Sequence, residues 1–399
     1  MARRVERESG HTLRSVEPSP GDPLPPPLVL LPPGAFAPSA LWLSAGATPP
    51  RKLGLADDRT TADAALGRIR AGEALLYTGD FRNARQLLSA LGRRLTPRRS
   101  RDAPPVEAFR RERHRRREAH LLLNRLLVPV AAGWRIPLPR APDVAEALGE
   151  ALGPAPEGAG LLPLREILGA VGAHEWRRGG VPVPSLGARV HPHHGVFAPV
   201  RGEYADLVGA ALEGRDLSGK VVFDVGTGTG VLAFLAARRG ATVIATDSEP
   251  RAVACARENA ARLGLEGRVE VREADLFPEG RADLVLCNPP WVPADAHTPL
   301  ERAVYDPGGR FLSGFLAGLR DHLAPGGEAW LVLSDLAERL GLREPGALEA
   351  AFAAAGLRRV EVRAAPATHP RAKDPDDPLH EARAGEVTSL HVLRPAEPV

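Results

Sequence analysis

The sequence predicts an α/β protein in which a seven-stranded sheet, covered by helices on both faces, follows an N-terminal helical domain. Beyond Leu217, seven short runs of apolar and β-branched residues alternate with longer runs of helical period, which is typical of a largely parallel sheet. Before residue 179, apolar residues recur mostly at helical spacing. The chain has 399 residues, which is long enough for two domains with a buried core each.

Proline content marks the first boundary along the chain. Residues 1–50 contain eleven prolines, and residues 51–96 contain none. We therefore expect residues 1–50 to form a flexible, partly polyproline-like tail, with the apolar run 41–43 in contact with the folded body. The expected organisation is a Pro-rich tail over 1–50, a helical domain over 51–178 and the α/β domain over 179–399.

The individual elements follow from capping and periodicity. Asp80 can cap a helix that begins at Phe81, because its carboxylate can accept from the first unpaired backbone N–H groups. Further helices of the first domain are expected over 105–127, 143–152 and 161–171. The seven strands of the second domain are expected over 221–225, 242–246, 269–272, 282–287, 329–334, 358–364 and 389–393, with helices over 231–239, 251–263 and 310–323.

Composition excludes several classes of protein. The chain has only two cysteines, Cys255 and Cys287, so a disulfide framework is excluded and we expect two buried thiols in a reducing compartment. The apolar run 28–31 is too short and too closely flanked by prolines for a signal sequence or a membrane span. We therefore expect a cytoplasmic protein without a membrane partner. A net charge of +3 does not by itself indicate a nucleic-acid partner.

A glycine-rich turn follows the first strand of the α/β domain. Asp224 lies in this strand, and Gly226, Gly228 and Gly230 follow it. Glycines here let the backbone approach a ligand beyond the carboxyl ends of the strands. A dinucleotide-binding loop would need glycine in place of Val231, and a carboxylate before the turn disfavours a pyrophosphate. The turn thus argues against a nicotinamide-dependent oxidoreductase and predicts a ligand with an ammonium group.

Acidic residues also follow the next two strands. Asp247 comes twenty-one positions after Gly226, close to the interval of roughly 20 residues at which a carboxylate meets a ribose diol. Asp275 follows the third strand, where its side chain can accept from an adenine amino group. Three acids without a phosphate-binding lysine describe a nucleoside that carries an amino-acid tail. The predicted cofactor is S-adenosylmethionine.

The fourth strand runs into the sequence Asn288-Pro289-Pro290-Trp291. The two prolines have no backbone N–H, so the local backbone groups that face a ligand are acceptors. The Asn288 side-chain oxygen and the Pro289 carbonyl can accept both hydrogens of one planar nitrogen, while the Trp291 ring can cover a planar group. Such a site works by turning that nitrogen toward a sulfonium methyl group, without a covalent enzyme intermediate. The candidate catalytic residues are Asn288, Pro289 and Trp291.

These residues resemble those of class I S-adenosylmethionine-dependent methyltransferases, over about 180–399. The Asn-Pro-Pro-aromatic motif resembles the signature of release-factor glutamine N5-methyltransferases and of adenine and guanine N-methyltransferases. The resemblance implies a Rossmann-like methyltransferase sheet and an enzyme. The cofactor-binding residues expected from the turn, the acids and this resemblance are Asp224, Gly226, Thr227, Gly228, Gly230, Asp247, Asp275, Leu276 and Asn288.

Two features bear on the methyl acceptor. Residues 197–199 and Arg201 resemble the turn that precedes the cofactor domain of the glutamine enzymes, although Gly202-Glu203 stands where that family usually has Asp-Thr. We therefore favour a macromolecular acceptor that is a protein glutamine amide over RNA, recruited by the 51–178 domain. A base N-methyltransferase of ribosomal RNA or other nucleic acid is the alternative, favoured if the arginine cluster over 93–117 faces the active site. A binding protein that retains the cofactor without transfer is disfavoured by the intact motif.

Two further segments have less specific interpretations. His191, His193 and His194 are expected to line a site or lie on the surface, and no metal is expected because no paired acid or cysteine accompanies them. The long connection over 367–387, between the last two strands, is interpreted as a substrate-facing loop.

Overall fold

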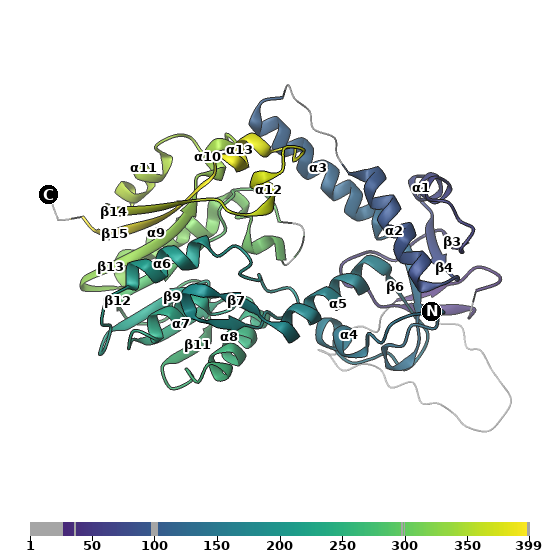
Figure 1. Cartoon of the computed structure of the whole chain (residues 1–399), viewed down its shortest axis with the longest axis horizontal. Coiled ribbons are helices and arrows are strands. Elements are labelled where there is room, and N and C mark those ends of the chain that lie inside the picture. Colours follow the sequence, from purple (N-terminus) through teal and green to yellow (C-terminus); the bar gives the residue numbers. More distant parts are fainter. Residues whose placement is uncertain (1–26, 36, 97–102, 297, 299, 397–399) are drawn as a thin grey trace, which may run out of the picture.

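The computed structural model describes residues 27–35, 37–96, 103–296, 298 and 300–396, which form two α/β units (Figure 1). The N-terminal unit is built on a six-stranded sheet of order β1-β2-β6-β5-β4-β3. Its strands are β1 (Leu28–Leu30), β2 (Ser39–Trp42), β3 (Leu53–Ala56), β4 (Ala74–Tyr77), β5 (Leu126–Val130) and β6 (Gly160–Pro163).

The prediction of an all-helical N-terminal domain is therefore wrong, because this unit is α/β. Most of the predicted helices are nevertheless present. They are α1 (Ala62–Arg70), α2 (Phe81–Leu95), α3 (Pro105–Leu123), α4 (Ala145–Leu152) and α5 (Leu164–Gly179). Asp80 caps α2 as predicted, since its carboxylate accepts from the Arg82 N–H at 2.8 Å. The segments expected as helices over 105–127 and 161–171 each combine a helix with residues of a buried strand.

The strands were missed because they are short and buried on both faces. β4, β5 and β6 are four or five residues long, and every residue in them is buried. An apolar run of this length does not alternate, so it cannot be distinguished from one turn of a buried helix. Residues 28–30 and 39–42 of the expected tail are also strands of this sheet, with Trp42 4% exposed. Residues 1–26 lie outside the described part of the chain.

The C-terminal unit has the seven-stranded α/β sheet that the sequence predicts. Its order is β11-β10-β9-β12-β13-β15-β14, in which β15 is antiparallel to both neighbours and the other pairs are parallel. The strands are β9 (Val221–Val225), β10 (Thr242–Asp247), β11 (Val269–Glu273), β12 (Ala282–Cys287), β13 (Leu323–Ser334), β14 (Leu357–Pro366) and β15 (Val387–Pro395).

Helices cover both faces of this sheet. Alternate residues of β9 point to opposite cores: Val222 packs with the helices over 203–212, 231–237 and 250–262, while Phe223 packs with those over 310–322 and 347–354. Cys255 and Cys287 are both buried, as expected, and burial raises the pKa of the Cys255 thiol to about 11. The helices are α6 (Glu203–Leu212), α7 (Val231–Ala237), α8 (Pro250–Arg262), α9 (Arg310–His322), α10 (Leu336–Arg339) and α11 (Ala347–Ala354).

Shorter elements complete this unit. A two-stranded sheet of β7 (Val181–Val183) and β8 (Ala188–Val190) lies between the two units in sequence. The connection between β14 and β15 contains the short helices α12 (Pro370–Lys373) and α13 (His380–Ala384). In the part of the chain that the structure describes, no helix has the length and apolar character that a bilayer crossing requires.

The two units contact each other at both ends of the gap between them. On one side, Arg177 of α5 and His193 each lie 2.7 Å from the Glu258 carboxylate of α8. On the other side, α3 reaches the connection 292–309 that follows the Asn-Pro-Pro-Trp motif (Figure 1). The N-terminal unit therefore touches the segment that lines the candidate site.

Candidate active site

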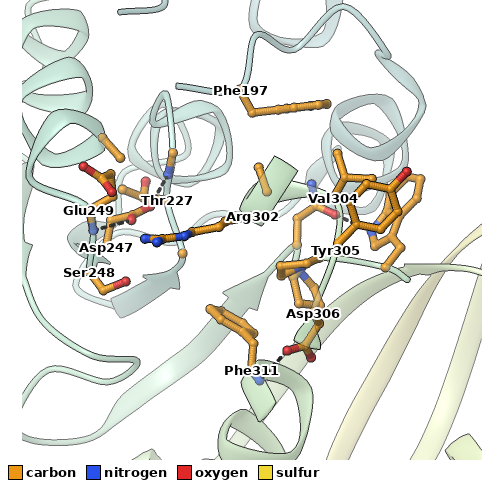
Figure 2. A pocket seen from close by; sticks show the side chains of 18 of the residues that line it. Phe197, Thr227, Asp247, Ser248, Glu249, Arg302, Val304, Tyr305, Asp306 and Phe311 are labelled. Atoms are coloured by element: carbon orange, nitrogen blue, oxygen red, sulfur yellow. Dashed lines mark hydrogen bonds between the residues drawn. The ribbon is translucent and has the colours of Figure 1, made fainter. Parts of the chain in front are cut away.

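A pocket of about 870 Å³ lies at the carboxyl ends of β9, β10, β11 and β12 (Figure 2). Parallel strands bring their carboxyl ends to one edge of the sheet, which is where ligands of such sheets bind. The predicted site residues that line this pocket are Asp224, Gly226, Thr227, Gly228, Asp247, Asp275, Leu276, Asn288, Pro289 and Trp291. Gly230 does not line it.

The glycine turn has a backbone that glycine suits. Gly226 has φ +73°, and a Cβ atom there would lie 3.1 Å from Phe311, which also lines the pocket. Gly230 has φ +94°, and its Cβ would lie 2.2 Å from the Phe234 ring. Gly230 thus allows α7 to begin tightly against the turn, although it does not line the pocket.

Asp224 holds the glycine turn in place through hydrogen bonds. It is 1% exposed, and one carboxylate oxygen accepts from the Thr227 hydroxyl at 2.6 Å and from the Ala233 N–H at 3.1 Å. Burial raises the pKa of Asp224 to about 6, although both hydrogen bonds favour the ionised form. The residue expected to meet a ligand ammonium group therefore also holds the glycine turn against α7.

Asp247, at the end of β10, is held by backbone N–H groups. One oxygen accepts from Gly228 at 2.9 Å and the other accepts from Glu249 at 3.0 Å. Burial raises the pKa of this carboxyl group above its ordinary value. The carboxylate thus has a fixed orientation in the pocket, next to the glycine turn (Figure 2). Its expected contact with a ribose diol stays a prediction.

The third acid has a different environment. Asp275 is exposed and lines the pocket beside Leu276. Leu276 has φ +68°, and its carbonyl accepts from the Thr246 hydroxyl at 2.5 Å. This bond fixes the turn after β11 to the end of β10. The two residues expected at the adenine ring are therefore placed on one wall, and their contact with a base stays a prediction.

The Asn-Pro-Pro-Trp turn contains an internal hydrogen bond. The Trp291 indole N–H donates to the Asn288 side-chain oxygen at 2.9 Å. The Arg201 guanidinium lies over the Trp291 ring, 5.1 Å from its centroid. Trp291 was expected to cover a planar acceptor group, but Arg201 lies over one face of its ring. An acceptor that stacks on Trp291 must use the other face.

Sequence reasoning missed the wall formed by residues 302–311. Figure 2 shows Arg302 directed into the pocket toward the side where Asp247 lies, with Tyr305 and Phe311 on the same wall. Asp306 is 5% exposed and accepts from the backbone N–H groups of Phe311 and Leu312 at 2.9 and 3.1 Å. An acid a few residues before a predicted helix is a capping signal, and it could have indicated that this segment is ordered.

The three histidines have protein partners. His191 Nδ1 lies 2.6 Å from the Arg177 carbonyl, His193 lies against Glu258 and His194 Nδ1 lies 3.1 Å from Arg251. Within residues 27–396, apart from the few that the structure does not describe, no group of three or more His, Cys, Asp or Glu could hold a metal ion. The histidines therefore connect β8 and the following turn to α5 and α8.

Part of the C-terminal unit is similar to known proteins. Residues 187–355 match the family model of the methyltransferase small domain. A release factor glutamine methyltransferase from Cereibacter sphaeroides is 41% identical over 157 residues, which are 35% of this chain and 54% of that protein. A ribosomal protein L11 methyltransferase from Vibrio cholerae is 37% identical over 131 residues, 32% of this chain and 44% of that protein.

A solved structure also has a partial similarity to this chain. The ribosomal protein L11 methylase from Lactobacillus delbrueckii subsp. bulgaricus is 22% identical, with a TM-score of 0.33 over 48% of this chain and 77% of that one. The chain spans about half the length of the curated relatives it matches. Residues 187–355 are therefore similar in sequence to methyltransferase small domains.

Proposed function

We propose that the whole chain is an S-adenosylmethionine-dependent N-methyltransferase that acts on a planar nitrogen of a macromolecule, with a protein glutamine side-chain amide as the favoured acceptor. One observation carries this proposal: Asn288, Pro289 and Trp291 line the same pocket as Asp224, Asp247 and Asp275. The motif that can accept hydrogens from a nitrogen thus shares one cavity with the carboxylates expected to bind the cofactor.

The pocket is suited to this cofactor. Its volume of about 870 Å³ is within the usual range of small-molecule sites, and its glycine turn lets the backbone approach a ligand closely. Asp247 would hold the ribose hydroxyls, Asp224 would face the ammonium group, and Asp275 with Leu276 would meet the adenine. When bound, the cofactor supplies an electrophilic methyl group on a sulfonium.

The chain's own residues would then orient the acceptor. An amide nitrogen is a weak nucleophile because its lone pair is delocalised, so its direction relative to the methyl group limits the reaction. The Asn288 side-chain oxygen and the Pro289 carbonyl would accept the two N–H groups and turn the nitrogen toward the methyl. Direct displacement would form the N–C bond as the S–C bond breaks, with a thioether as the leaving group and one amide proton released to water, so it would need no nucleophile from the protein.

The arginine-rich helix supports a protein acceptor over RNA. In α3, Arg113 pairs with Glu301 at 3.0 Å and Arg116 pairs with Glu112, which is 4% exposed. These two cations are therefore neutralised within the protein. The relatives named for a release factor and a ribosomal protein also support a protein acceptor.

An RNA base is the second candidate acceptor, because other arginines of α3 remain exposed. Arg110 and Arg117 are exposed on this helix, and Arg117 lines a groove between α3 and the 371–378 segment. Exposed arginines along a groove are suited to contact phosphates. Asp374 and Asp376 line the same groove, and their negative charge opposes a polyanion.

Labelled cofactor distinguishes the acceptors directly. The protein is incubated with radiolabelled S-adenosylmethionine and a lysate of the source cells, and the product is treated with protease or with ribonuclease. Release of the label by protease alone supports the favoured function, and release by ribonuclease alone supports the second candidate. If the folded protein binds the cofactor and labels neither polymer, the chain is a cofactor-binding protein and the proposed function is wrong.

A further inference from the structure

The hydrogen bond inside the Asn-Pro-Pro-Trp turn restricts the Asn288 side chain to one orientation. An indole N–H can only donate, so the Asn288 atom that faces Trp291 at 2.9 Å is the amide oxygen. A carbonyl oxygen has two lone pairs. One receives the indole N–H, and the other remains for a second donor in the pocket that both residues line.

The indole ring is in turn held in place by Arg201. The guanidinium lies 5.1 Å from the ring centroid, and it donates to the Glu386 carboxylate at 3.0 Å. The Glu386 side chain is fully buried and also accepts from the Ser334 hydroxyl at 2.7 Å. A buried carboxylate with two donors is a fixed anchor, so Arg201 cannot leave the ring without loss of this contact.

We infer that Trp291 and Arg201 are positioning residues that keep the Asn288 oxygen directed at the acceptor nitrogen. Without the indole N–H, the amide can turn by 180° and present its NH₂ group to the pocket. Two donors would then face each other, and the acceptor nitrogen would lose the hydrogen bond that orients it. This inference rests on the proposed N-methyltransferase function.

The same contacts give the 367–387 connection a structural role. Glu386 lies at its end, His369 Nε2 lies 3.3 Å from that carboxylate, and the Thr368 N–H donates to Glu203 at 2.8 Å. The connection is therefore attached to the turn that carries Arg201. The 367–387 connection, which was expected to face the substrate, thus supports the proposed acceptor site indirectly, through the contacts of Glu386 with Arg201 and of Arg201 with Trp291.

Substitutions at Trp291 separate orientation from packing. Trp291→Phe keeps an aromatic ring but removes the N–H, and Arg201→Met keeps the length of the side chain but removes its charge. In the lysate assay with labelled cofactor, we expect the turnover of Trp291→Phe at saturating acceptor to fall about tenfold or more. The dissociation constant for the cofactor is expected to stay within twofold. Trp176→Phe, on the 47% exposed Trp176 of α5, is the matched control and should keep wild-type turnover.

A second measurement tests the hydrogen bond without an acceptor. In protein with ¹⁵N-labelled tryptophan, the indole signal that Trp291→Phe removes is assigned to Trp291. Asn288→Ala should move this signal upfield and increase its hydrogen exchange, while Glu386→Gln should produce a smaller shift in the same signal. If Asn288 did not accept from the Trp291 indole N–H, its removal would leave the Trp291 indole signal in place.

The outcomes separate this inference from the proposed function. If wild-type protein labels an acceptor and folded Trp291→Phe keeps its turnover within twofold, the positioning role is wrong. If the Trp291 signal does not respond to Asn288→Ala, the hydrogen bond is absent in solution and the inference fails. If wild-type protein labels no acceptor, the proposed function fails, and the positioning role for transfer fails with it even where the indole signal responds.

Discussion

Arg113 of α3 holds Glu301 in the connection that lines the active-site pocket, through two nitrogen–oxygen contacts of 3.0 and 3.2 Å. Its guanidinium also lies 4.0 Å from the centroid of the Tyr305 ring, and it donates to the Asp295 carbonyl. Arg113 is on the N-terminal unit, whereas its three partners are on the C-terminal unit. The position of the pocket wall therefore depends on where the N-terminal unit lies.

Loss of this contact should loosen the wall. We expect Arg113→Gln to make residues 292–309 more sensitive to limited proteolysis, because a paired and stacked guanidinium is replaced by a neutral amide. The rate of cleavage in this connection, located by mass spectrometry, measures the effect. Arg117→Gln, a change at an exposed residue of the same helix, should leave the rate unchanged. Equal rates of cleavage for wild type and Arg113→Gln would contradict the role of Arg113 in holding the 292–309 connection in place.

Removal of the Asp247 carboxylate should weaken cofactor binding. Asp247→Ala would lose the proposed charged acceptor for the ribose hydroxyls and would also free the Gly228 N–H that Asp247 holds. We expect a loss of about 1.5 to 3 kcal/mol, on the order of ten- to a hundredfold in the dissociation constant. Titration calorimetry measures the dissociation constant. Asp247→Asn keeps an acceptor oxygen, so its dissociation constant should lie between those of the wild type and of Asp247→Ala. Unchanged affinity in folded Asp247→Ala would falsify the assignment.

Removal of the Asn288 amide should affect chemistry more than cofactor binding. Asn288→Ala would take away the proposed acceptor for the target nitrogen but leave the glycine turn intact. Turnover should drop by about two orders of magnitude or more, with little change in cofactor affinity. Single-turnover transfer and calorimetry on the same preparation test both parts. Near-normal turnover on the true acceptor would exclude the orienting role of Asn288.

Cofactor affinity should depend on pH through Asp224. Its pKa of about 6 means that the carboxyl group is ionised at pH 8 and becomes protonated as the pH falls below about 6. An ammonium group favours the ionised form, so affinity should be flat above pH 7 and decrease as the pH falls through 6. The raised pKa of Asp247 acts in the same direction.

The control for this titration is Asp224→Asn, whose amide oxygen can still accept from Thr227 and Ala233. This variant should bind the cofactor weakly at every pH, and its affinity should depend less on pH near 6 than that of the wild type, since only Asp247 then contributes. Dissociation constants at half-unit intervals from pH 5 to 8 test the expectation. Wild-type affinity that does not change over this range would show that Asp224 does not meet the ammonium group.

The salt dependence of acceptor binding can distinguish RNA from protein, when it is compared between the wild type and variants that lack exposed arginines. For an RNA acceptor, the double change Arg110→Gln and Arg117→Gln should reduce the slope of log affinity against log salt by about 0.7 to 0.9 for each lost phosphate contact. For a protein acceptor, we expect the slope to change little, since exposed charges contribute little to a docking interface. Because Arg113 and Arg116 are paired within the protein, they are left unchanged. A large arginine-dependent slope would favour RNA.

In the C-terminal unit, the seven strands and the helices α7, α8 and α9 could be predicted because their signals are local, whereas α6 and α11 were not predicted. The seven strands alternate with helices, and the glycine turn and the acids after β10 and β11 follow directly from sequence order. The parallel arrangement then brings these residues to one edge of the sheet. Most of the expected site residues therefore line one pocket.

The remaining features depend on contacts between distant segments. The sheet of the N-terminal unit pairs β2 with β6, more than one hundred residues apart in sequence, and four-residue buried strands carry no periodic signal. Arg201 meets Trp291 only because the turn before α6 packs against the turn after β12. The bonds of Asp224 and Asp247 to backbone N–H groups depend on the conformation of the glycine turn, which residue identities alone do not specify.

The burial of both thiols makes the chain suitable for site-specific labelling. Cys255 and Cys287 are each 0% exposed, and burial raises both of their pKa values, so maleimide and iodoacetamide should react slowly with the folded protein. A single cysteine introduced at Arg110, with a second at an exposed position of the C-terminal unit, would then accept a donor and an acceptor dye without removal of the native cysteines. Energy transfer between the dyes would then report whether the distance between the two units changes when the cofactor and a macromolecule bind.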